Sequence, residues 1–368
     1  MRIAKLGELT KIKTGKLDAN ASVEGGRYPF FTCSIDPLRI DSYSYDCECV
    51  LLAGNGDLNV KYYEGRFDAY QRTYIIESED RCSLDTRYLY YFLTQYVQQL
   101  RDSSIGAVIK YIKKGDLTEA VIPLPEITIQ KRIICNLDLV IKLLDKEKKK
   151  EKYFDELVKS RFVEMFGYIG EGTFIYPPKR IEDLCLEIIG GGTPSMKHPE
   201  YYGGSIPFIK SGDVKSQVVT NGNLSITKEG LKRSSAKLAP MHSILVVTRS
   251  GILKHTLPIA IAGCSVAINQ DLKALVLNES VIPEYIQWSL LVSKQLILSK
   301  VRATTADNIE TSLLKNFMVP VPPLQLQHEF ADFAAQVDKL KFETQQSIEK
   351  LQTLYDSLAQ EYFAPEGD

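Results

Sequence analysis

The apolar and polar positions along this 368-residue chain follow the same order twice. Residues 51–78 and residues 245–280 each contain an apolar run typical of a buried strand, then a glycine-containing turn, a variable insert and a second strand. Residues 85–100 and 282–298 then show the three-and-four spacing of an amphipathic helix, after a capping Asp or Pro. The equivalent glutamines, Gln71 and Gln270, lie 199 residues apart. This recurrence predicts a tandem duplication of one unit.

Each copy ends in a proline-rich stop and a long helical pattern. The stretches "VIPLPEITIQKRI" (residues 121–133) and "MVPVPPLQLQHEF" (residues 318–330) match Pro123 with Pro320 and Gln130 with Gln327. Proline forces extended backbone, and heptad-like apolar spacing then continues for about 35 residues, which favours a coiled coil. The predicted apolar seam consists of Ile133, Leu137, Val140, Leu144, Phe154 and Val158 in the first helix, and of Phe330, Phe333, Val337, Leu340, Ile348, Leu351, Leu354 and Leu358 in the second.

These patterns predict an α+β protein. We expect two similar α/β domains separated by two long helices, which pair as an antiparallel coiled coil and relate the domains by a pseudo-two-fold axis. The predicted boundaries are residues 1–122 for the first domain, 123–166 for the first helical spacer, 167–320 for a linker and the second domain, and 321–368 for the second spacer.

Composition and charge narrow the function classes. The chain is 44% hydrophobic and 25% charged, with no signal peptide and no apolar run of membrane-spanning length, so we expect a soluble, cytoplasmic protein. Its seven cysteines and four histidines have no metal-ligand spacing, and no nucleophile lies at a recognisable distance from a base. We therefore predict neither a metal site nor a catalytic residue. The net charge of -1 is uneven, because residues 177–320 sum to +5 and residues 321–368 to -6.

The stretch "GGTPSMKHPEYYGGSIPFIKSGDV" (residues 191–214) is rich in glycine but fits neither a dinucleotide-binding fingerprint nor a P-loop. Turns joining short strands explain its composition, and Tyr201, Tyr202 and Phe208 are expected to be core residues. A second interpretation is that the glycines permit close approach of a sugar-phosphate backbone, to which nearby Thr, Ser and Lys side chains donate.

Several motifs together give the chain a family resemblance. The stretch just quoted, with "AGNGD" (residues 53–57), "AYQRTY" (residues 69–74), "INQDLKAL" (residues 268–275) and the proline-rich helix entries, resembles the specificity subunit of type I restriction-modification systems. The resemblance covers essentially the whole chain. The first domain lacks a Gly-Gly-Thr-Pro-Ser opening, and "TRSGILKH" (residues 248–255) alters the family's usual turn, which suggests that the two domains read different half-sites.

The resemblance implies two target recognition domains that bind double-stranded DNA and have no catalytic activity of their own. It implies a complex with two methyltransferase subunits, which methylate adenine with S-adenosylmethionine, and with ATP-dependent restriction subunits. S-adenosylmethionine, ATP and Mg are therefore expected in the partner subunits, and no cofactor in this chain.

Candidate DNA contacts follow from the side chains that pair with bases or phosphates. Residues shared by both copies suit structure or backbone contact, whereas residues that choose a sequence are expected where the copies diverge, in residues 11–26, 59–67 and 251–262. The competing interpretation is a two-headed scaffold that binds proteins and no DNA. The candidates are Lys13, Lys16, Lys61, Arg66, Gln71, Arg72, Lys110, Thr193, Ser195, Lys197, Lys210, Ser211, Arg249, Lys254, Asn269, Gln270, Arg302 and Asn308.

Overall fold

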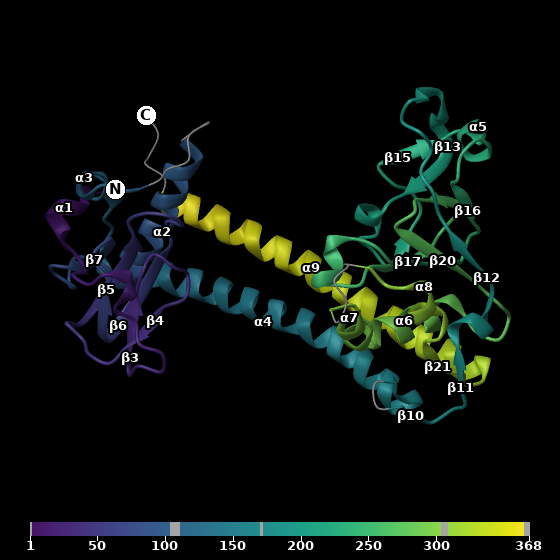
Figure 1. Cartoon of the computed structure of the whole chain (residues 1–368). Coiled ribbons are helices and arrows are strands. Elements are labelled where there is room, and N and C mark those ends of the chain that lie inside the picture. Colours follow the sequence, from purple (N-terminus) through teal and green to yellow (C-terminus); the bar gives the residue numbers. More distant parts are fainter. Residues whose placement is uncertain (1, 104–110, 170–171, 303–307, 364–368) are drawn as a thin grey trace. The chain divides into compact units, whose positions relative to one another are not determined.

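The computed structural model describes residues 2–103, 111–169, 172–302 and 308–363 (Figure 1). The chain forms two compact units, one of residues 1–149 with 344–368 and the other of residues 150–343. The division falls within two long helices, α4 (Ile127–Phe166) and α9 (Leu324–Phe363), so each unit contains a head of strands and short helices plus part of both long helices. The α+β expectation is confirmed. None of the helices in the described ranges is long and apolar enough to span a membrane.

The first unit is built on a six-stranded sheet with strand order β2-β7-β5-β6-β3-β4. Alternate residues of its central strand face opposite sides: Val50 and Leu52 pack in the core that contains α2, and Cys49 and Leu51 pack in a smaller core on the other side. The strands and helices of this head are β1 (Ile3–Lys5), α1 (Leu6–Leu9), β2 (Thr10–Thr14), η1 (Ala19–Ala21), β3 (Tyr28–Phe31), β4 (Leu38–Ile40), β5 (Tyr45–Ala53), β6 (Val60–Ala69), β7 (Thr73–Ser78), α2 (Thr86–Ser103), α3 (Lys114–Thr118) and β8 (Val121–Pro123).

In the second unit the equivalent strands, together with the additional strands β14 and β16, form a five-stranded sheet, β12-β20-β17-β18-β14, and a four-stranded sheet, β15-β13-β19-β16. The single long strand β6 of the first unit corresponds here to β18 and β19, which are separated by residues 263–265. The elements are β9 (Gly167–Tyr168), β10 (Thr173–Phe174), β11 (Pro178–Arg180), η3 (Ile181–Leu184), β12 (Cys185–Gly190), η4 (Pro199–Tyr201), β13 (Tyr202–Ile209), η5 (Ser211–Asp213), β14 (Val218–Val219), β15 (Leu224–Ile226), α5 (Lys228–Lys232), β16 (Lys237–Ala239), β17 (Ile244–Val247), η6 (Gly251–Lys254), β18 (Ile259–Ala262), β19 (Val266–Ile268), β20 (Leu272–Leu277), α6 (Pro283–Val292), α7 (Lys294–Arg302), α8 (Thr311–Lys315) and β21 (Met318–Pro320).

Equivalent hydrogen bonds show that the two heads repeat the same structure. The Tyr88 hydroxyl donates to the Pro123 carbonyl at 2.9 Å, and the Tyr285 hydroxyl donates to the Pro320 carbonyl at 2.7 Å; both pairs are separated by 35 residues. All four residues come from the helix and the proline-rich stop that the sequence pattern aligned. The predicted helix of residues 282–298 is interrupted at Ser293, between α6 and α7.

In each unit one buried glutamine of the long helix bonds to the proline-rich stop that precedes that helix. Gln130 and Gln327 are both 0% exposed. The Gln327 side chain accepts from the Ile282 amide at 3.0 Å and donates to the carbonyls of Ser280 and Pro322 at 3.0 and 2.9 Å. Gln130 makes the three equivalent bonds in the first unit, at sequence separations of 45, 47 and 5 residues in both cases. The glutamine of each motif is therefore structural.

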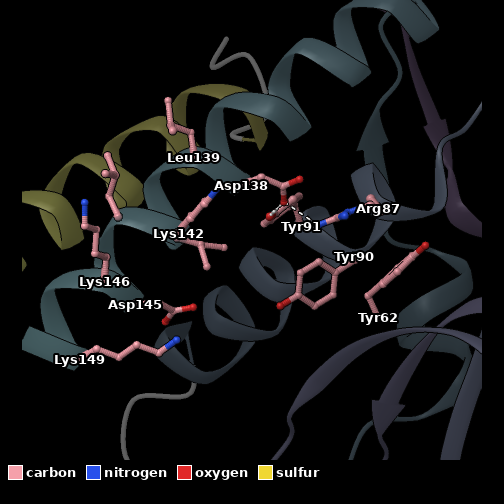
Figure 2. Close-up of a pocket in the computed structure, with 12 residues that line it drawn as sticks. Tyr62, Arg87, Tyr90, Tyr91, Asp138, Leu139, Lys142, Asp145, Lys146 and Lys149 are labelled. Carbon is pink, nitrogen blue, oxygen red and sulfur yellow. Dashed lines mark hydrogen bonds and ion pairs between the residues drawn. The ribbon is translucent and has the colours of Figure 1, made fainter.

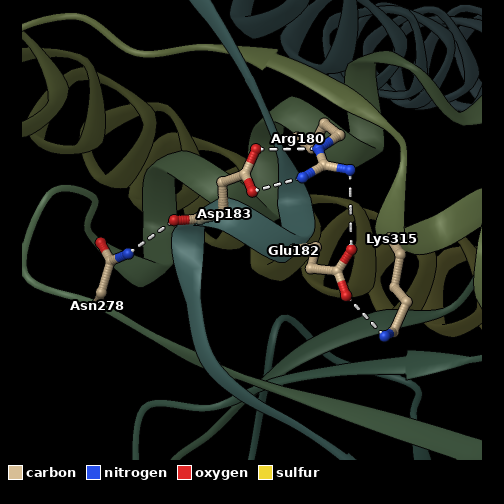
Figure 3. A network of polar contacts seen from close by, with 5 residues as sticks. All are labelled: Arg180, Glu182, Asp183, Asn278 and Lys315. Atoms are coloured by element: carbon tan, nitrogen blue, oxygen red, sulfur yellow. Dashed lines mark hydrogen bonds and ion pairs between the residues drawn. The ribbon is translucent and has the colours of Figure 1, made fainter.

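A network of polar contacts fixes the chain where it enters the second head (Figure 3). The Arg180 guanidinium donates to the Asp183 carboxylate at 3.0 and 2.9 Å. Lys315 of α8 donates to Glu182 at 2.7 Å, and the Asn278 amide donates to the Asp183 carbonyl at 3.0 Å. Together with the antiparallel pairing of β11 and β21, these contacts join the beginning and the end of the head.

Within each unit the segments of α4 and α9 pack antiparallel. In the second unit Arg161 pairs with Glu329 at 3.4 Å and Lys341 with Asp155 at 2.9 Å. In the first unit the Asn136 amide donates to the Tyr362 hydroxyl at 3.1 Å. The residue numbers rise along one helix as they fall along the other, as the antiparallel coiled coil requires.

Most of the predicted seam residues are buried or half-buried, but two of them are exposed. Leu340 and Leu354 are 49% and 46% exposed and lie off the buried face, because a 3.6-residue period drifts away from strict heptad spacing along a long helix. Small or polar residues that the apolar pattern passed over, such as Ala334, Thr344 and Ala359, are buried instead. The buried seam residues are Ile133, Leu137, Val140, Leu144, Val158, Phe330 and Val337, and the half-buried ones are Phe154, Phe333, Ile348, Leu351 and Leu358.

Candidate nucleic-acid interface

In each head several strands end at the same edge, and we call the loops that meet there the strand-end surface. In the second unit the parallel strands β13 and β19 end together, with Ile209 paired to Ile268, and β16 begins opposite Ile268. In the first unit the parallel strands β3 and β6 end together at Phe31 and Ala69. The surface comprises residues 15–18, 32–34, 54–55 and 70–72 in the first unit and residues 191–193, 210–211, 248–249 and 269–271 in the second.

In the first unit this surface carries the glutamine and the arginine predicted from the sequence. The Gln71 amide donates to the Asp18 carboxylate at 2.8 Å, which ties the loop after β6 to the loop after β2. Arg72 is exposed, and its backbone carbonyl accepts from the Gly54 amide at 2.8 Å. Lys16 is exposed in the same loop cluster. The structure thus brings Lys16, Gln71 and Arg72 to one edge.

The second unit repeats the glutamine tether with different residues around it. The Thr193 hydroxyl donates to the Gln270 side chain at 2.5 Å, so that Gln270 joins the loops after β12 and β19 as Gln71 joins those after β2 and β6. The glutamine donates in the first head and accepts in the second, but in both heads it joins the same two loops, as expected for a structural residue shared by the two copies.

Arg249 is held by an acidic neighbour on this surface. Its guanidinium Nε and Nη2 both lie 2.8 Å from the Asp271 carboxylate, and the Asn269 amide donates to the other carboxylate oxygen at 2.9 Å. Arg249 also forms an isolated β-bridge with Asn308, and Asn55 forms the equivalent bridge with Tyr111 in the first unit. Asn55 and Arg249 therefore occupy matching places with different chemistry.

Two predicted cations of the first head, Lys13 and Arg66, have ion-pair partners within the protein. Glu77 binds Lys13 at 2.8 Å and raises the pKa of its ammonium group. Arg66 pairs with Asp46 at 3.0 Å and lies 5.0 Å from the centre of the Tyr43 ring. Exposed ion pairs of this kind contribute little stability, so they can exchange for a ligand phosphate at small cost.

Lys61 is more deeply placed than the sequence suggested. It is half-buried on β6, where burial lowers the pKa of its ammonium group. It donates to the Ser34 carbonyl at 2.8 Å and to the Asn59 side chain. These bonds fix the turn between β5 and β6.

The candidates in the glycine-rich stretch fall into two groups. Ser195 and Lys197 are exposed in one turn, where the Lys197 amide donates to the Ser195 hydroxyl at 3.3 Å. Lys210 and Ser211 follow β13 at the strand-end surface, where Asp213 accepts from the Lys210 amide at 2.9 Å. Thr193, Lys210 and Ser211 therefore lie at the candidate interface.

The glycines of this stretch make room for the protein's own backbone. A Cβ atom on Gly191 would lie 2.2 Å from the Asn269 carbonyl oxygen, one on Gly192 would lie 2.2 Å from the Ser235 hydroxyl, and one on Gly204 would lie 2.4 Å from the Ile226 carbonyl oxygen. Contacts within the same head thus explain the glycine at these three positions, and close approach of a sugar-phosphate backbone stays a prediction. Tyr201 and Phe208 are buried, as expected of core residues.

Two cations beside the strand-end surface, Lys237 and Lys273, were missed by sequence reasoning. Lys237 begins β16 directly opposite Ile268. Lys273 extends over Gly190, where a Cβ atom would lie 2.8 Å from its ammonium nitrogen. The positive charge of residues 177–320 was the available signal, but only the strand pairing shows which lysines reach this edge.

The remaining candidates lie elsewhere. Lys254 is exposed at the end of η6, and Arg302 is the last residue of α7. Lys110 lies outside the described residues. Within the described ranges, no group of three or more His, Cys, Asp or Glu side chains is arranged to hold a metal ion.

Comparison with known proteins places this fold in a family. The chain is 39% identical over 158 residues to the type I restriction enzyme EcoDI specificity subunit of Escherichia coli, a match that covers 43% of this chain. The matched segments cover 35% of the length of that relative and 38% of a second specificity subunit, so they span little more than a third of these curated relatives.

Two solved structures share the fold at low sequence identity. The S subunit of the type I restriction-modification system from M. genitalium superimposes with a TM-score of 0.59 at 15% identity, covering 100% of this chain and 96% of that one. A chain from a study of complex assembly and conformational transition of the type I R-M system gives a TM-score of 0.64 at 18% identity, covering 98% and 97%.

The family model described as the type I restriction modification DNA specificity domain matches residues 1–152 and again residues 176–353. Each match covers one of the repeated heads and part of the long helix that follows it. This chain belongs to the family of type I restriction-modification specificity subunits.

Proposed function

We propose that this chain is the DNA-binding specificity subunit of a type I restriction-modification complex and reads a bipartite, asymmetric target with one half-site per head. The observation that carries the proposal is the strand-end surface, which recurs in both heads with the same glutamine tether but different neighbours. Asn55 of the first head is replaced by Arg249 in the second, and Arg72 by Asp271. A repeated frame with different polar side chains suits two readers of different sequences.

The chemistry would come from partner subunits. In this proposal two methyltransferase subunits supply S-adenosylmethionine-dependent adenine methylation, and restriction subunits supply ATP- and Mg-dependent cleavage. This chain positions them on the DNA and is itself non-catalytic. The division of labour rests on the family membership and on the two-headed repeat.

The long helices offer a place where a methyltransferase subunit would dock. In the first unit a groove of about 860 Å³ runs between α2 and α4 (Figure 2). Leu139 and Leu143 line it and are 56% and 38% exposed, although the helix buries its other face. Two exposed leucines one turn apart, beside a groove, suit a contact with another protein. The groove also contains the cations Lys142, Lys146 and Lys149.

A network of polar contacts connects the residues on the floor of this groove. The Asp138 carboxylate accepts from Arg87 at 2.7 Å and from the Tyr91 hydroxyl, and the Arg87 guanidinium lies 5.3 Å from the centre of the Tyr62 ring. Burial and the Asp138 bond raise the pKa of the Tyr91 hydroxyl, so it stays protonated and donates at neutral pH. A groove with this polar floor, lined by leucines and lysines, suits a helix or loop of a partner protein.

Filter binding tests the proposal against the two-headed protein scaffold. The chain, co-expressed with its methyltransferase subunit, is mixed with random-sequence duplex at several salt concentrations. Neutralised phosphates release counterions, so DNA binding should weaken steeply as the salt concentration rises. Absence of binding at every salt concentration would favour the scaffold.

A further inference from the structure

The second head contains a segment that the first head lacks. The strand pairs β3–β4 and β13–β15 are equivalent, since Phe30 pairs with Leu38 as Phe208 pairs with Leu224. In the first head residues 41–44 join the second strand of this pair to the next strand, β5. In the second head residues 227–243 make the same connection and form α5 and β16. We call residues 227–243 the inserted segment.

The inserted segment is fixed to the head at three places. The Thr227 amide donates to the Tyr201 carbonyl at 2.9 Å. A Cβ atom on Gly230 would lie 2.5 Å from the same carbonyl oxygen, so α5 packs directly on this backbone. Farther along, β16 pairs antiparallel with β19, which places Lys237 opposite Ile268. The segment is thus an ordered part of the sheet.

The middle of the inserted segment, at Ser235 and Lys237, lies next to the strand-end surface. Ser235 packs on Gly192, one residue before the Thr193 that bonds Gln270. Lys237 begins its strand where β19 ends, next to Asn269. The inserted segment therefore extends the strand-end surface of the second head along one side.

The segment is basic and its charges face solvent. It carries four cations and one acidic residue, Glu229, which pairs with Arg233. Lys228, Lys232 and Lys237 are exposed, and none of the three has an ion-pair partner among the residues that the structure describes. Three exposed ammonium groups without carboxylate partners, on a segment whose Lys237 lies beside the candidate DNA interface, suit contact with a polyanion better than a protein surface of mixed sign does.

We infer that the inserted segment is a phosphate-contacting element of the second head, where Lys228, Lys232 and Lys237 bind the DNA backbone beside the half-site. This inference rests on the proposed function and adds an asymmetry to it: the second head holds its half-site with a larger electrostatic contribution than the first. Backbone contacts carry no sequence information, so the element strengthens binding without choosing bases.

The test replaces the three lysines together, as Lys228→Ala, Lys232→Ala and Lys237→Ala, in the complex with the methyltransferase subunit. Binding to duplex containing the methylated target is measured across a series of salt concentrations. Each lost phosphate contact should lower the slope of log K against log salt by about 0.9, so a decrease of about 2 to 3 is expected. The methylated sequence should stay unchanged.

The matched control replaces the same residues by arginine, which keeps the charge and should restore the slope. An alanine variant that assembles normally and keeps the wild-type slope would overturn the inference while leaving the proposed function in place. A wild-type complex whose binding does not depend on salt would contradict the proposed function itself. A changed recognition sequence in the alanine variant would show that these lysines read bases, which also contradicts the inference.

Discussion

The hydroxyl of Thr193 donates to the side chain of Gln270 at 2.5 Å, and this bond joins two loops that lie 77 residues apart in the sequence. In the first head the equivalent loops are joined by the Gln71 amide, which donates to the Asp18 carboxylate at 2.8 Å. The glutamine is constant and its partner differs. This arrangement makes the two glutamines positioning residues that hold neighbouring side chains where DNA would be read.

Replacing the tether should weaken binding without changing the sequence that is read. In Gln270→Ala the loop carrying Thr193 loses its bond, and target methylation should slow. Stability should fall by no more than about 1 kcal/mol, because the bond is exposed. Methylation of a randomised target library gives the sequence preference. Relaxed choice at one base of the motif would instead identify Gln270 as a base reader, and Gln71→Ala provides the matched change in the first head.

The buried glutamines should matter far more for stability. Gln327→Leu keeps the side-chain volume but leaves the Ile282 amide and two carbonyls without their partner. Buried polar groups without a hydrogen bond cost about 1–3 kcal/mol each, so the unfolding free energy should fall by at least about 2 kcal/mol in urea titrations. Gln71→Leu, at an exposed site, should change it by about 0.5 kcal/mol or less. Similar losses in the two variants would contradict the structural role.

Two leucines in one turn of α4 separate stability from partner binding. Leu137 is 0% exposed and Leu139 is 56% exposed. Leu137→Asp buries a charge and should destabilise the first unit by several kcal/mol. Leu139→Asp should leave the melting temperature unchanged but reduce recovery of the methyltransferase subunit in co-purification. Full recovery of the subunit with Leu139→Asp and Leu143→Asp combined would move the docking surface elsewhere.

Asp338 should make the second unit less stable as the pH rises. Burial raises the pKa of its carboxyl group above the ordinary value of 3.8, although Gln217 donates to it at 3.0 Å. The native state thus holds the proton more tightly than the unfolded state, and the stability conferred by protonation is lost as pH rises from about 4 through the raised pKa. Asp338→Asn should remove this contribution and be more stable than the wild type at pH 7. Parallel stability curves for the two proteins between pH 4 and 7 would contradict this explanation.

The sequence was sufficient for the repeat, the fold class and most of the buried face of the long helices, because these depend on local apolar periodicity. Gln130 and Gln327 stood out as a matched pair through the repeated proline-rich motif, although their three hydrogen bonds depend on backbone groups brought in by the fold. Leu340 and Leu354 were wrongly predicted to be buried, because the heptad pattern does not show how the buried face of a helix with a 3.6-residue period shifts along its length.

The candidate interface was harder to predict, because it is formed by strand ends that meet only through parallel pairing. Lys237 and Lys273 reach this edge through the register of β16 and β20, which no local pattern encodes. For the glycines at 191, 192 and 204 the sequence left two interpretations open, because it does not distinguish close approach of DNA from close approach of the protein's own chain.

The central claim is that each head reads its own half-site, and an exchange of heads tests it most directly. Residues 177–320 are replaced by the equivalent part of a relative with a different target, and the bases methylated by the co-expressed complex are determined by sequencing. One half of the split motif should change to that of the relative, while the other half stays as in the wild type. A change in both halves, or in neither, would contradict the account.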